Sequence, residues 1–311
     1  MAFKNNGIKD GRKIINKLLI QIKKNITKYG IYYLFLLPFL IPFSLFLVYP
    51  LINAFIYSFH KYNLSTYKFI GLDNYIKILN DPLFRRSIIT TCYFVIGAVP
   101  SIIFITILLS SLLIKMKDKL RTLFMGIFYL PTVTTVIFFV LSWKLVYDYR
   151  YGILNFIMRL LGYENINWLS NKYTVIPSLV AMIVYGTLGV PIILYISAMA
   201  AIPKSLYEVA KIDGATEWQI LKNITIPLIM PTTLYIMITL TIGVFQTFIL
   251  VYLMTGGGPY YRTMTMNYFM VQEAFTNSNF GMSSAIGIVF LFMISILVII
   301  QYRFFSKEIE Y

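Results

Sequence analysis

Six long stretches of the chain are almost wholly apolar, and none of them contains Asp, Glu, Lys, Arg or His. A helix needs about 20 such residues to cross a bilayer, because each residue adds about 1.5 Å of length. The pattern therefore predicts an all-α membrane protein with six transmembrane helices. They are expected at Tyr33–Phe59, Ile88–Ile114, Leu123–Leu141, Tyr173–Ala201, Leu228–Met254 and Ser283–Gln301.

Prolines interrupt most of these stretches, among them Pro42, Pro100, Pro131 and Pro191. A proline inside a helix removes a backbone donor and bends the helix. In a membrane bundle, neighbouring helices and Ser/Thr hydroxyls satisfy the carbonyls that this frees. We therefore expect kinked helices rather than straight rods.

Between the fourth and fifth stretches, over residues 203–227, short amphipathic pieces replace the apolar run. Asp213 and Gly214 end the first of these pieces, since glycine accepts the positive φ that commonly ends a helix. Thr216, with Gln219 three residues on, has the spacing of a capping box that begins a second helix. That second piece has an apolar face formed by Ile220, Leu221 and Ile224. This face either packs against its own bundle or docks into a partner.

The composition excludes an ordinary soluble enzyme, a disordered protein and a coiled coil. Charged residues make up only 13% of the chain and hydrophobic residues 59%, whereas soluble domains carry about 25% charge. The net charge of +15 would indicate nucleic acid in a soluble protein. In a membrane protein, basic residues instead mark the cytoplasmic side, and we expect no nucleic-acid partner.

The basic residues give an orientation and a division of the chain. Residues 1–30 hold eight Lys and Arg against one acid, which predicts a basic cytoplasmic N-terminal segment able to lie on anionic lipid. Residues 31–306 form the predicted six-helix transmembrane domain, and 307–311 a short cytoplasmic tail. Both termini are then inside, with 17 of the 27 Lys and Arg on that face.

Residues that carry bond chemistry are scarce. The chain has one cysteine, Cys92, and one histidine, His60, and no G-x-x-x-x-G-K-[ST] loop that would cradle ATP phosphates. We expect no catalytic group, metal or cofactor in this chain, which counts against an intramembrane enzyme. The charge-free spans also disfavour a secondary transporter, because proton or sodium coupling normally needs buried acids or histidine.

The segment Glu208-Val-Ala-x-x-Asp213-Gly214-Ala215, followed by Ile224-x-Ile226-Pro227, resembles the EAA loop of binding-protein-dependent ABC importer permeases. Val209 replaces the usual second alanine, and Leu221 stands where phenylalanine is common. Both departures are mild.

Other segments resemble the carbohydrate-type permeases of the same group. They are Gly71-Leu-Asp-Asn-Tyr75 with Asp81-Pro-x-Phe84, Phe128-Tyr-Leu-Pro131, and Thr255-Gly-Gly-Gly-Pro259 with Thr263. The last resembles the Gly-Gly-Pro outer loop found in one partner of the permease pair. The resemblance covers nearly the whole chain after about residue 30.

The resemblance implies a non-catalytic permease subunit of an ATP-driven importer in the bacterial cytoplasmic (inner) membrane. Its implied partners are a second homologous permease, two ATP-binding subunits that hold ATP and Mg, and an extracellular solute-binding protein. The EAA loop would couple to the ATPase through Glu208, Ala210, Asp213, Gly214 and Ala215. For Glu208 the alternative is a solvated surface charge. The outer segments would meet the binding protein at Asp73, Asn74, Gly257, Gly258 and Pro259.

Charge-free spans favour an uncharged, hydroxyl-rich solute such as a sugar or oligosaccharide, which stacks on aromatic rings and bonds to neutral polar groups. The candidate path residues are Tyr185, Gly189, Phe245, Gln246 and Thr247. Packing is the alternative for the aromatic and small residues, and interhelical hydrogen bonding for Gln246. The runner-up is an ABC permease for another solute, such as glycerol-phosphate or a polyol.

Overall fold

The computed structural model describes residues 32 and 34–306. The predicted basic segment 1–30, the tail 307–311 and the first residue of the first predicted span, Tyr33, lie outside the described residues. The chain divides into two compact units, 1–56 and 57–311, which are described separately.

The first unit is helical wherever it is described. A helix of 25 residues begins at Leu34, contains the π-helical stretch η1 (Ser44–Val48) and continues as α2 (Tyr49–Ser58). In the most hydrophobic 18-residue window of this helix, no residue is buried within the chain. A helix of 25 residues with a mean hydropathy of 2.2 in this window is long and apolar enough to cross a bilayer.

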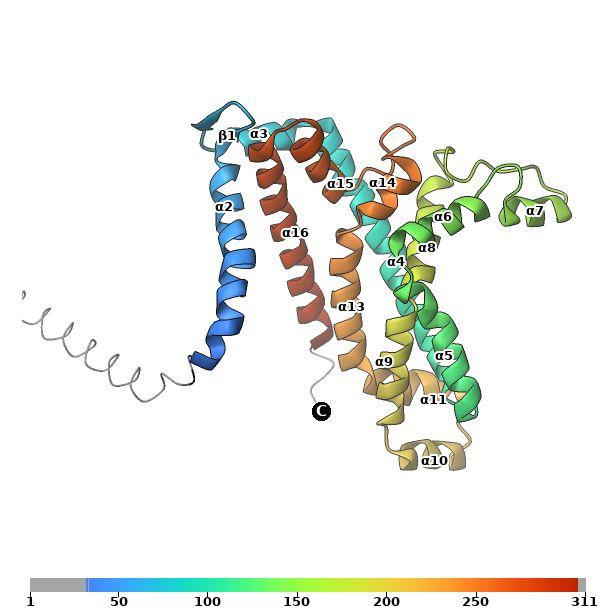
Figure 1. Cartoon of the computed structure of the whole chain (residues 1–311). Coiled ribbons are helices and arrows are strands. Elements are labelled where there is room, and N and C mark those ends of the chain that lie inside the picture. The colour runs from blue at the N-terminus through green and yellow to red at the C-terminus, as the bar shows by residue number, and fades with distance from the viewer. Residues whose placement is uncertain (1–31, 33, 307–311) are drawn as a thin grey trace, which may run out of the picture. The chain divides into compact units, whose positions relative to one another are not determined.

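In the second unit the regular elements are helices, apart from one hairpin (Figure 1). Its membrane-sized elements include two long helices, α4 (Pro82–Leu113) and α16 (Phe280–Ser306). The other elements are β1 (His60–Tyr62), β2 (Tyr67–Phe69), α3 (Asp73–Asn80), α5 (Asp118–Val133), α6 (Val136–Val146), α7 (Ile153–Leu160), α8 (Val175–Thr187), α9 (Gly189–Ala200), α10 (Lys204–Ile212), α11 (Glu217–Ile220), η2 (Leu221–Thr225), α12 (Ile226–Leu228), α13 (Met230–Phe245), α14 (Ile249–Thr255), α15 (Met266–Val271) and η3 (Gln272–Thr276).

The described residues contain three helices long and apolar enough to cross a membrane, or up to six spans if each bent helix pair counts as one. The bent pairs are α5 with α6 at 102°, α8 with α9 at 50°, and the helical run Glu217–Leu228 with α13 at 71°. The predicted all-α membrane fold with bent helices is therefore confirmed.

Two predicted spans are less continuous than the sequence indicated. The predicted helix Leu123–Leu141 breaks at Thr134 and Thr135, whose extended backbone follows Pro131 by three and four residues. The predicted helix Leu228–Met254 ends at Phe245, and α14 begins only at Ile249. Hydropathy cannot locate such breaks, because the residues on both sides are equally apolar.

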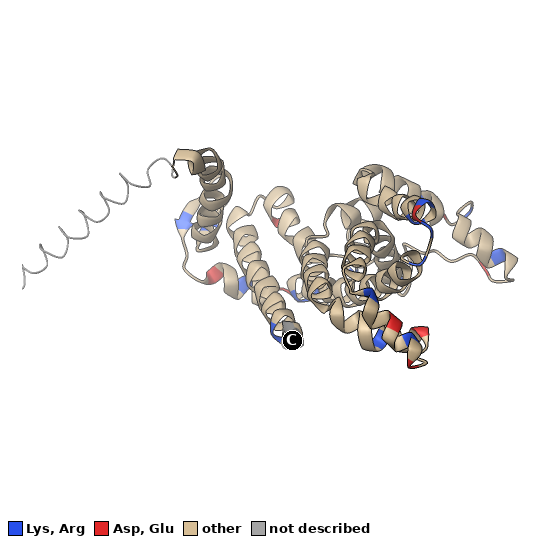
Figure 2. Cartoon of the chain, turned by 90° about the horizontal axis from the view of Figure 1, so that it is seen from below, with Lys and Arg blue, Asp and Glu red and all other residues tan. Residues whose placement is uncertain are grey.

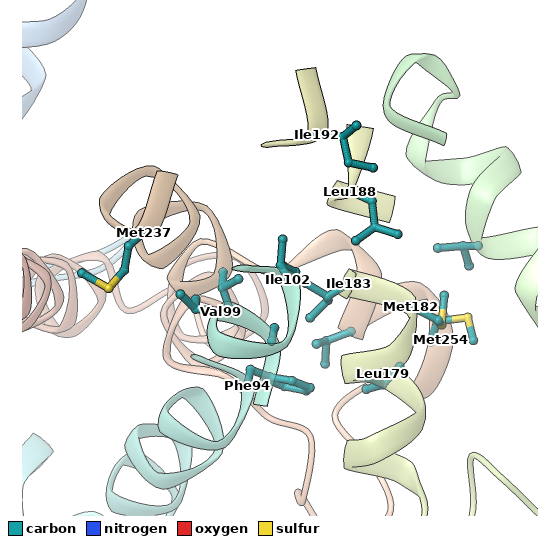
Figure 3. Close-up of a cluster of buried hydrophobic side chains, with 14 of the residues drawn as sticks. Phe94, Val99, Ile102, Leu179, Met182, Ile183, Leu188, Ile192, Met237 and Met254 are labelled. Atoms are coloured by element: carbon teal, nitrogen blue, oxygen red, sulfur yellow. The ribbon is translucent and has the colours of Figure 1, made fainter. Parts of the chain in front are cut away.

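The main apolar core lies where α4 packs against α8, α9 and α13. Phe94, Leu179, Met182 and Ile192 are among its fully buried side chains, and Figure 3 shows them converging from different helices. Close-packed aliphatic groups of this kind fix the helices to one another. The core thus holds the bent pairs in place around the breaks.

The two ends of the second unit differ in their elements. In Figure 1, α10 and α11 lie at one end of the helices, and α3, α14, α15 and α7 lie at the opposite end. Figure 2 shows the long helices mostly without charge, whereas charged residues gather on the α10–α11 segment. This is the charge distribution expected for a membrane bundle with polar ends.

Candidate functional site

A cavity of about 750 Å³ lies beside three helix breaks, namely the α5–α6 and α8–α9 breaks of two bent pairs and the break between α13 and α14. Thr134 comes from the break between α5 and α6, and Thr187 from the end of α8. Gln246, Thr247 and Phe248 come from the break between α13 and α14. Non-helical backbone is tolerated at membrane depth only where protein or a cavity surrounds it, so the cavity and the breaks belong together.

The cavity wall carries polar groups but no charge. None of its lining residues is Asp, Glu, Lys, Arg or His. The neutral hydrogen-bonding side chains in the wall are Thr132, Thr134, Thr187, Tyr235, Thr239, Gln246, Thr247 and Asn267. A wall of this kind can bind hydroxyl groups and apolar faces, and it offers no counter-ion to a charged solute.

The break after α13 is held open by side chains from α15 and the residue before it. Asn267 donates a hydrogen bond from Nδ2 to the Gln246 carbonyl at 2.7 Å. The buried hydroxyl of Thr265 donates to the Thr247 carbonyl at 2.9 Å. These bonds satisfy carbonyls that a continued helix would have used, and they leave the Gln246 side chain exposed on the cavity wall.

The five predicted path residues fall into two groups. Gln246 and Thr247 line the cavity, whereas Tyr185, Gly189 and Phe245 are outside its lining. Their role in transport stays a prediction.

The second group has evident packing contacts. Phe245 is fully buried against Phe290, and the Tyr185 ring stacks on Phe139 with ring centres 6.4 Å apart. At Gly189 a Cβ atom would lie 2.7 Å from the Tyr129 Cα, so glycine permits the close approach of α9 to α5.

Sequence reasoning predicted Thr247 but missed Asn267 and the other four threonines of the wall, Thr132, Thr134, Thr187 and Thr239. Asn267 is 21 residues away from Gln246 along the chain and reaches it only through the folded loop. For the α5–α6 break a signal was present, since Pro131 is followed closely by three threonines. Such a cluster in an apolar stretch favours interrupted backbone.

At the opposite end, the predicted break in the EAA-like loop is confirmed. Gly214 has φ +75°, and the Gly214 and Ala215 amides donate to the carbonyls of Lys211 and Ala210. These two bonds form a Schellman motif that ends α10. Ala210, Gly214 and Ala215 thus shape the helix end, whatever they contact outside the chain.

The second helix of the loop begins as predicted. The Thr216 hydroxyl accepts a hydrogen bond from the Gln219 amide, and the Gln219 side chain accepts one from the Thr216 amide, forming a capping box. Next to this cap, Glu217 contacts Lys115 at 2.6 Å. The Lys115 hydrogen bond and charge hold the pKa of the Glu217 carboxyl below its ordinary value of 4.5.

The two helices of the loop expose their apolar residues differently. Ile220 and Leu221 are buried against the bundle, so this piece packs on its own chain. No residue of α10 is buried; Val209 and Ile212 are 57% and 85% exposed, and Glu208 lies on the same exposed helix. An apolar ridge that its own chain leaves uncovered is a candidate docking surface.

The predicted binding-protein contacts differ in exposure. Asp73 is exposed in the first turn of α3, whereas Asn74 is 4% exposed and donates to the carbonyls of Ser58 and His60 at 2.9 Å each. Asn74 therefore ties the hairpin to α3.

The Gly-Gly-Pro segment forms a tight turn at the same end. Thr263 donates to the Gly258 carbonyl at 2.8 Å, and Gly257 is buried. The side chain that this turn presents most openly is Tyr260, at 85% exposure, which the sequence did not single out.

Within the described part of the chain, no group of three or more His, Cys, Asp or Glu residues is placed to hold a metal ion.

Comparison with known proteins identifies the family. The sequence profile of the family described as "Binding-protein-dependent transport system inner membrane component" matches residues 79–311. The trehalose/maltose transport system permease protein MalF of Thermococcus litoralis is 31% identical over 275 residues, which cover 88% of this chain and 92% of that protein. The arabinooligosaccharides permease AraP of Bacillus subtilis is 29% identical over 273 residues, 87% of each chain.

The fold has a counterpart among solved structures. A chain of a bacterial ABC transporter that imports the acidic polysaccharide alginate superposes with a TM-score of 0.81 at 21% identity, covering 92% of this chain and 99% of that one. A second structure of an alginate ABC transporter, in complex with a periplasmic protein bound to alginate pentasaccharide, gives a TM-score of 0.80 at 22% identity. The profile match over most of the chain and the identity to MalF show that the protein belongs to the family of inner membrane components of binding-protein-dependent transport systems.

Proposed function

We propose that this chain is the permease subunit of an ABC importer that moves a neutral sugar or oligosaccharide into the cell. The observation that carries the proposal is the uncharged, hydroxyl-rich cavity at the three helix breaks. Its volume, about 750 Å³, is in the range of pockets that hold small organic ligands. Relatives with 28–31% identity are named for arabinooligosaccharides, trehalose/maltose and lactose, which supports a saccharide as cargo.

The cavity wall suits such a solute by its chemistry. Saccharide hydroxyls both donate and accept hydrogen bonds, as do the threonine hydroxyls and the Gln246 amide. Phe139 and Tyr235 add ring faces that can cover the apolar side of a sugar. The alternative, an anionic ester such as glycerol-phosphate, would require a cation in the wall, and the lining has none. An uncharged polyol stays compatible with the same wall.

Energy for transport would come from two separate ATP-binding subunits. The exposed ridge of α10, with Glu208 beside Val209 and Ile212, is the surface proposed to seat in them. The Schellman turn at Gly214 would fix the angle between this ridge and the packed α11. Movement of the ATP-binding subunits would reach the bundle through η2 and α12, which continue into α13.

A second, similar permease would complete the path, and an extracellular solute-binding protein would deliver the cargo. Asp73 and the turn at Gly257, Gly258 and Pro259 lie at the end proposed to receive it. With α10 and α11 inside, the N-terminal segment 1–30 and the tail 307–311 would both be cytoplasmic. The six-helix domain would span residues 31–306.

Reconstitution in proteoliposomes tests the proposal. Uptake of a labelled neutral oligosaccharide should require this chain, the second permease, the ATP-binding subunits and the solute-binding protein together. ATP hydrolysis by this chain alone, or uptake without the ATP-binding subunits, would contradict it. Thermal-shift screening of the binding protein with neutral and acidic saccharides would identify the cargo class.

A further inference from the structure

A second pocket, of about 400 Å³, is lined by three arginines. Part of its lining is the start of α4, which directly follows α3, and Figure 1 shows α3 at the end opposite α10. Arg85 and Arg86 come from the second turn of α4, and Arg262 comes from the segment between α14 and α15. Its remaining lining residues are Pro82, Ile89, Thr90, Tyr93 and Ile176. No acidic residue lines this pocket.

Among the described residues, no ion pair joins any of these three guanidinium groups to a carboxylate. The ion pairs among the described residues are Lys115 with Glu217 and Arg121 with Asp118, and neither involves the pocket. The acid nearest in sequence is Asp81, whose Oδ1 accepts hydrogen bonds from the Leu83 and Phe84 amides. Arginine stays charged at any physiological pH, so the pocket keeps its positive charge.

Arg262 gives a more specific sign of a missing ligand. Its Nε atom is buried and has no hydrogen-bond partner among the described residues. Its backbone is fixed in place, since its carbonyl accepts a hydrogen bond from the Thr90 hydroxyl at 3.0 Å and its amide donates to Pro259 at 2.9 Å. Buried polar groups in proteins normally have a hydrogen-bond partner, so we expect a bound group to supply the acceptor for this donor.

Arg85 is partly positioned as well. Its Nε donates to the Leu79 carbonyl at 2.8 Å, which leaves the terminal nitrogens of the guanidinium for another acceptor. Charge, geometry and the unpaired donor therefore all indicate an anionic oxygen ligand such as a phosphate.

The other wall of the pocket is apolar and continues along the membrane span. Ile89 and Tyr93 are each 53% exposed, and Ile96, one turn further, is 70% exposed. Their spacing of four and three residues places them on one face of α4. The charge-free part of α4 begins at Ser87, directly after the arginines. The pocket thus stands at the boundary between headgroup and hydrocarbon levels.

We propose that this pocket binds the phosphate of an anionic phospholipid, with the acyl chains lying along Ile89, Tyr93 and Ile96. A guanidinium group donates two parallel hydrogen bonds to phosphate oxygens, so three arginines suit a phosphate headgroup. A soluble anion would satisfy the arginines but leave the apolar face of α4 uncovered. The inference rests on the membrane fold and is independent of which solute the protein carries.

The test measures retained lipid on the full-length chain, purified in mild detergent with its co-purifying subunits. After exposure to phosphatidylglycerol or phosphatidylcholine micelles and washing, native mass spectrometry should find phosphatidylglycerol retained at least about tenfold over phosphatidylcholine, since three cations act on one headgroup. Equal retention of the two lipids would overturn the proposal.

Matched variants locate the site. Arg85→Gln, Arg86→Gln and Arg262→Gln together should remove the preference for phosphatidylglycerol. The control, Lys61→Gln, Lys68→Gln and Lys77→Gln, removes the same charge from exposed positions and should leave the preference intact. If both triple variants behave alike, the pocket is not the site.

Two further measurements keep the result decisive. Arg86→Gln alone changes one exposed side chain, so folding is preserved. It should still reduce the preference for phosphatidylglycerol severalfold. An unchanged preference would contradict the site even if the triple variant does not assemble. Inorganic phosphate added alone should neither displace the lipid at millimolar concentration nor raise the thermal midpoint. If it does both, the pocket takes a soluble anion and the lipid assignment is wrong.

Discussion

The Lys115 ammonium nitrogen lies 2.6 Å from a Glu217 carboxylate oxygen, and this contact joins the loop after α4 to the first turn of α11. Both side chains are more than half exposed, at 55% and 63%. An exposed ion pair contributes at most about 1 kcal/mol. We therefore assign it a positioning role, in which it fixes α11, and with it the exposed ridge of α10, relative to the C-terminal end of α4.

Breaking this ion pair should weaken the coupling of ATP hydrolysis to solute uptake more than it lowers the stability of the protein. Lys115→Glu or Glu217→Lys should lower the amount of solute moved per ATP hydrolysed by up to about fivefold, the factor that corresponds to about 1 kcal/mol. The double reversal should restore the ratio. The measurement is uptake and ATPase activity in the same proteoliposomes.

A matched control is available in the Asp118–Arg121 pair, which has the same 2.6 Å separation but lies within α5. Asp118→Asn should leave the coupling ratio unchanged. If both pairs behave alike, or if the double reversal fails to recover coupling, the positioning role is wrong.

The Schellman turn at Gly214 makes a second prediction. Gly214→Ala should cost about 1–2 kcal/mol locally, because an alanine at φ +75° is in the left-handed region. No heavy atom lies within 4 Å of the added Cβ, so backbone strain alone should fray the end of α10 and uncouple ATPase activity from uptake. Gly126→Ala in α5, also without a neighbour within 4 Å, is the control and should retain coupling. Equal uptake by the two variants would exclude a role for the turn.

The neighbouring residues Asp73 and Asn74 should behave differently. Asn74→Ala removes two donors to the Ser58 and His60 carbonyls and should destabilise the protein by about 2–3 kcal/mol. Asp73→Ala, at an exposed position, should change stability by no more than about 1 kcal/mol and should weaken binding of the solute-binding protein. Thermal midpoints and binding titrations separate the two effects; a stable Asn74→Ala variant would show that the hairpin does not depend on that amide.

Glu273, which lies in η3 before α16, predicts a pH dependence of the protein's stability. Burial raises the pKa of its carboxyl above the ordinary 4.5, the hydrogen bond from Asn277 opposes this, and the nearby Asp81 charge adds to the rise. A raised pKa in the folded protein means that stability is full below pH 4.5 and falls as the pH rises through the folded pKa, by at most about 1.4 kcal/mol per pH unit.

Glu273→Gln keeps an oxygen acceptor for Asn277 and removes the titration. Its thermal midpoint should exceed that of the unmodified protein at pH 8 and match it at pH 4. A difference that is constant across this range would mean that burial of the carboxylate does not set the pH dependence.

The sequence was informative where local chemistry decides the structure. The capping box at Thr216 and Gln219 and the positive φ at Gly214 depend on residues three or four positions apart, and the structure has both. The six apolar stretches likewise indicated an all-α membrane fold, because burying backbone in lipid allows little else.

What escaped prediction depends on residues that only folding brings together. Arg262 meets Arg85 across more than 170 positions of sequence, and Asn267 meets the Gln246 carbonyl through a folded loop. The 102° bend after α5 is also invisible to hydropathy, since both arms are apolar. Phe245 is buried against Phe290, and the Tyr185 ring stacks on Phe139; the part of both residues in transport stays a prediction.

Uptake by variants at Gln246 tests the central claim most directly, because this side chain combines hydrogen-bonding capacity with a place on the wall of the uncharged cavity. In proteoliposomes with all subunits and the binding protein, Gln246→Leu should lower uptake of the neutral oligosaccharide by about tenfold while ATPase activity persists. Gln246→Asn, which keeps the amide, should retain most of it. Undiminished uptake by Gln246→Leu would contradict the account, because the solute would then not pass this wall.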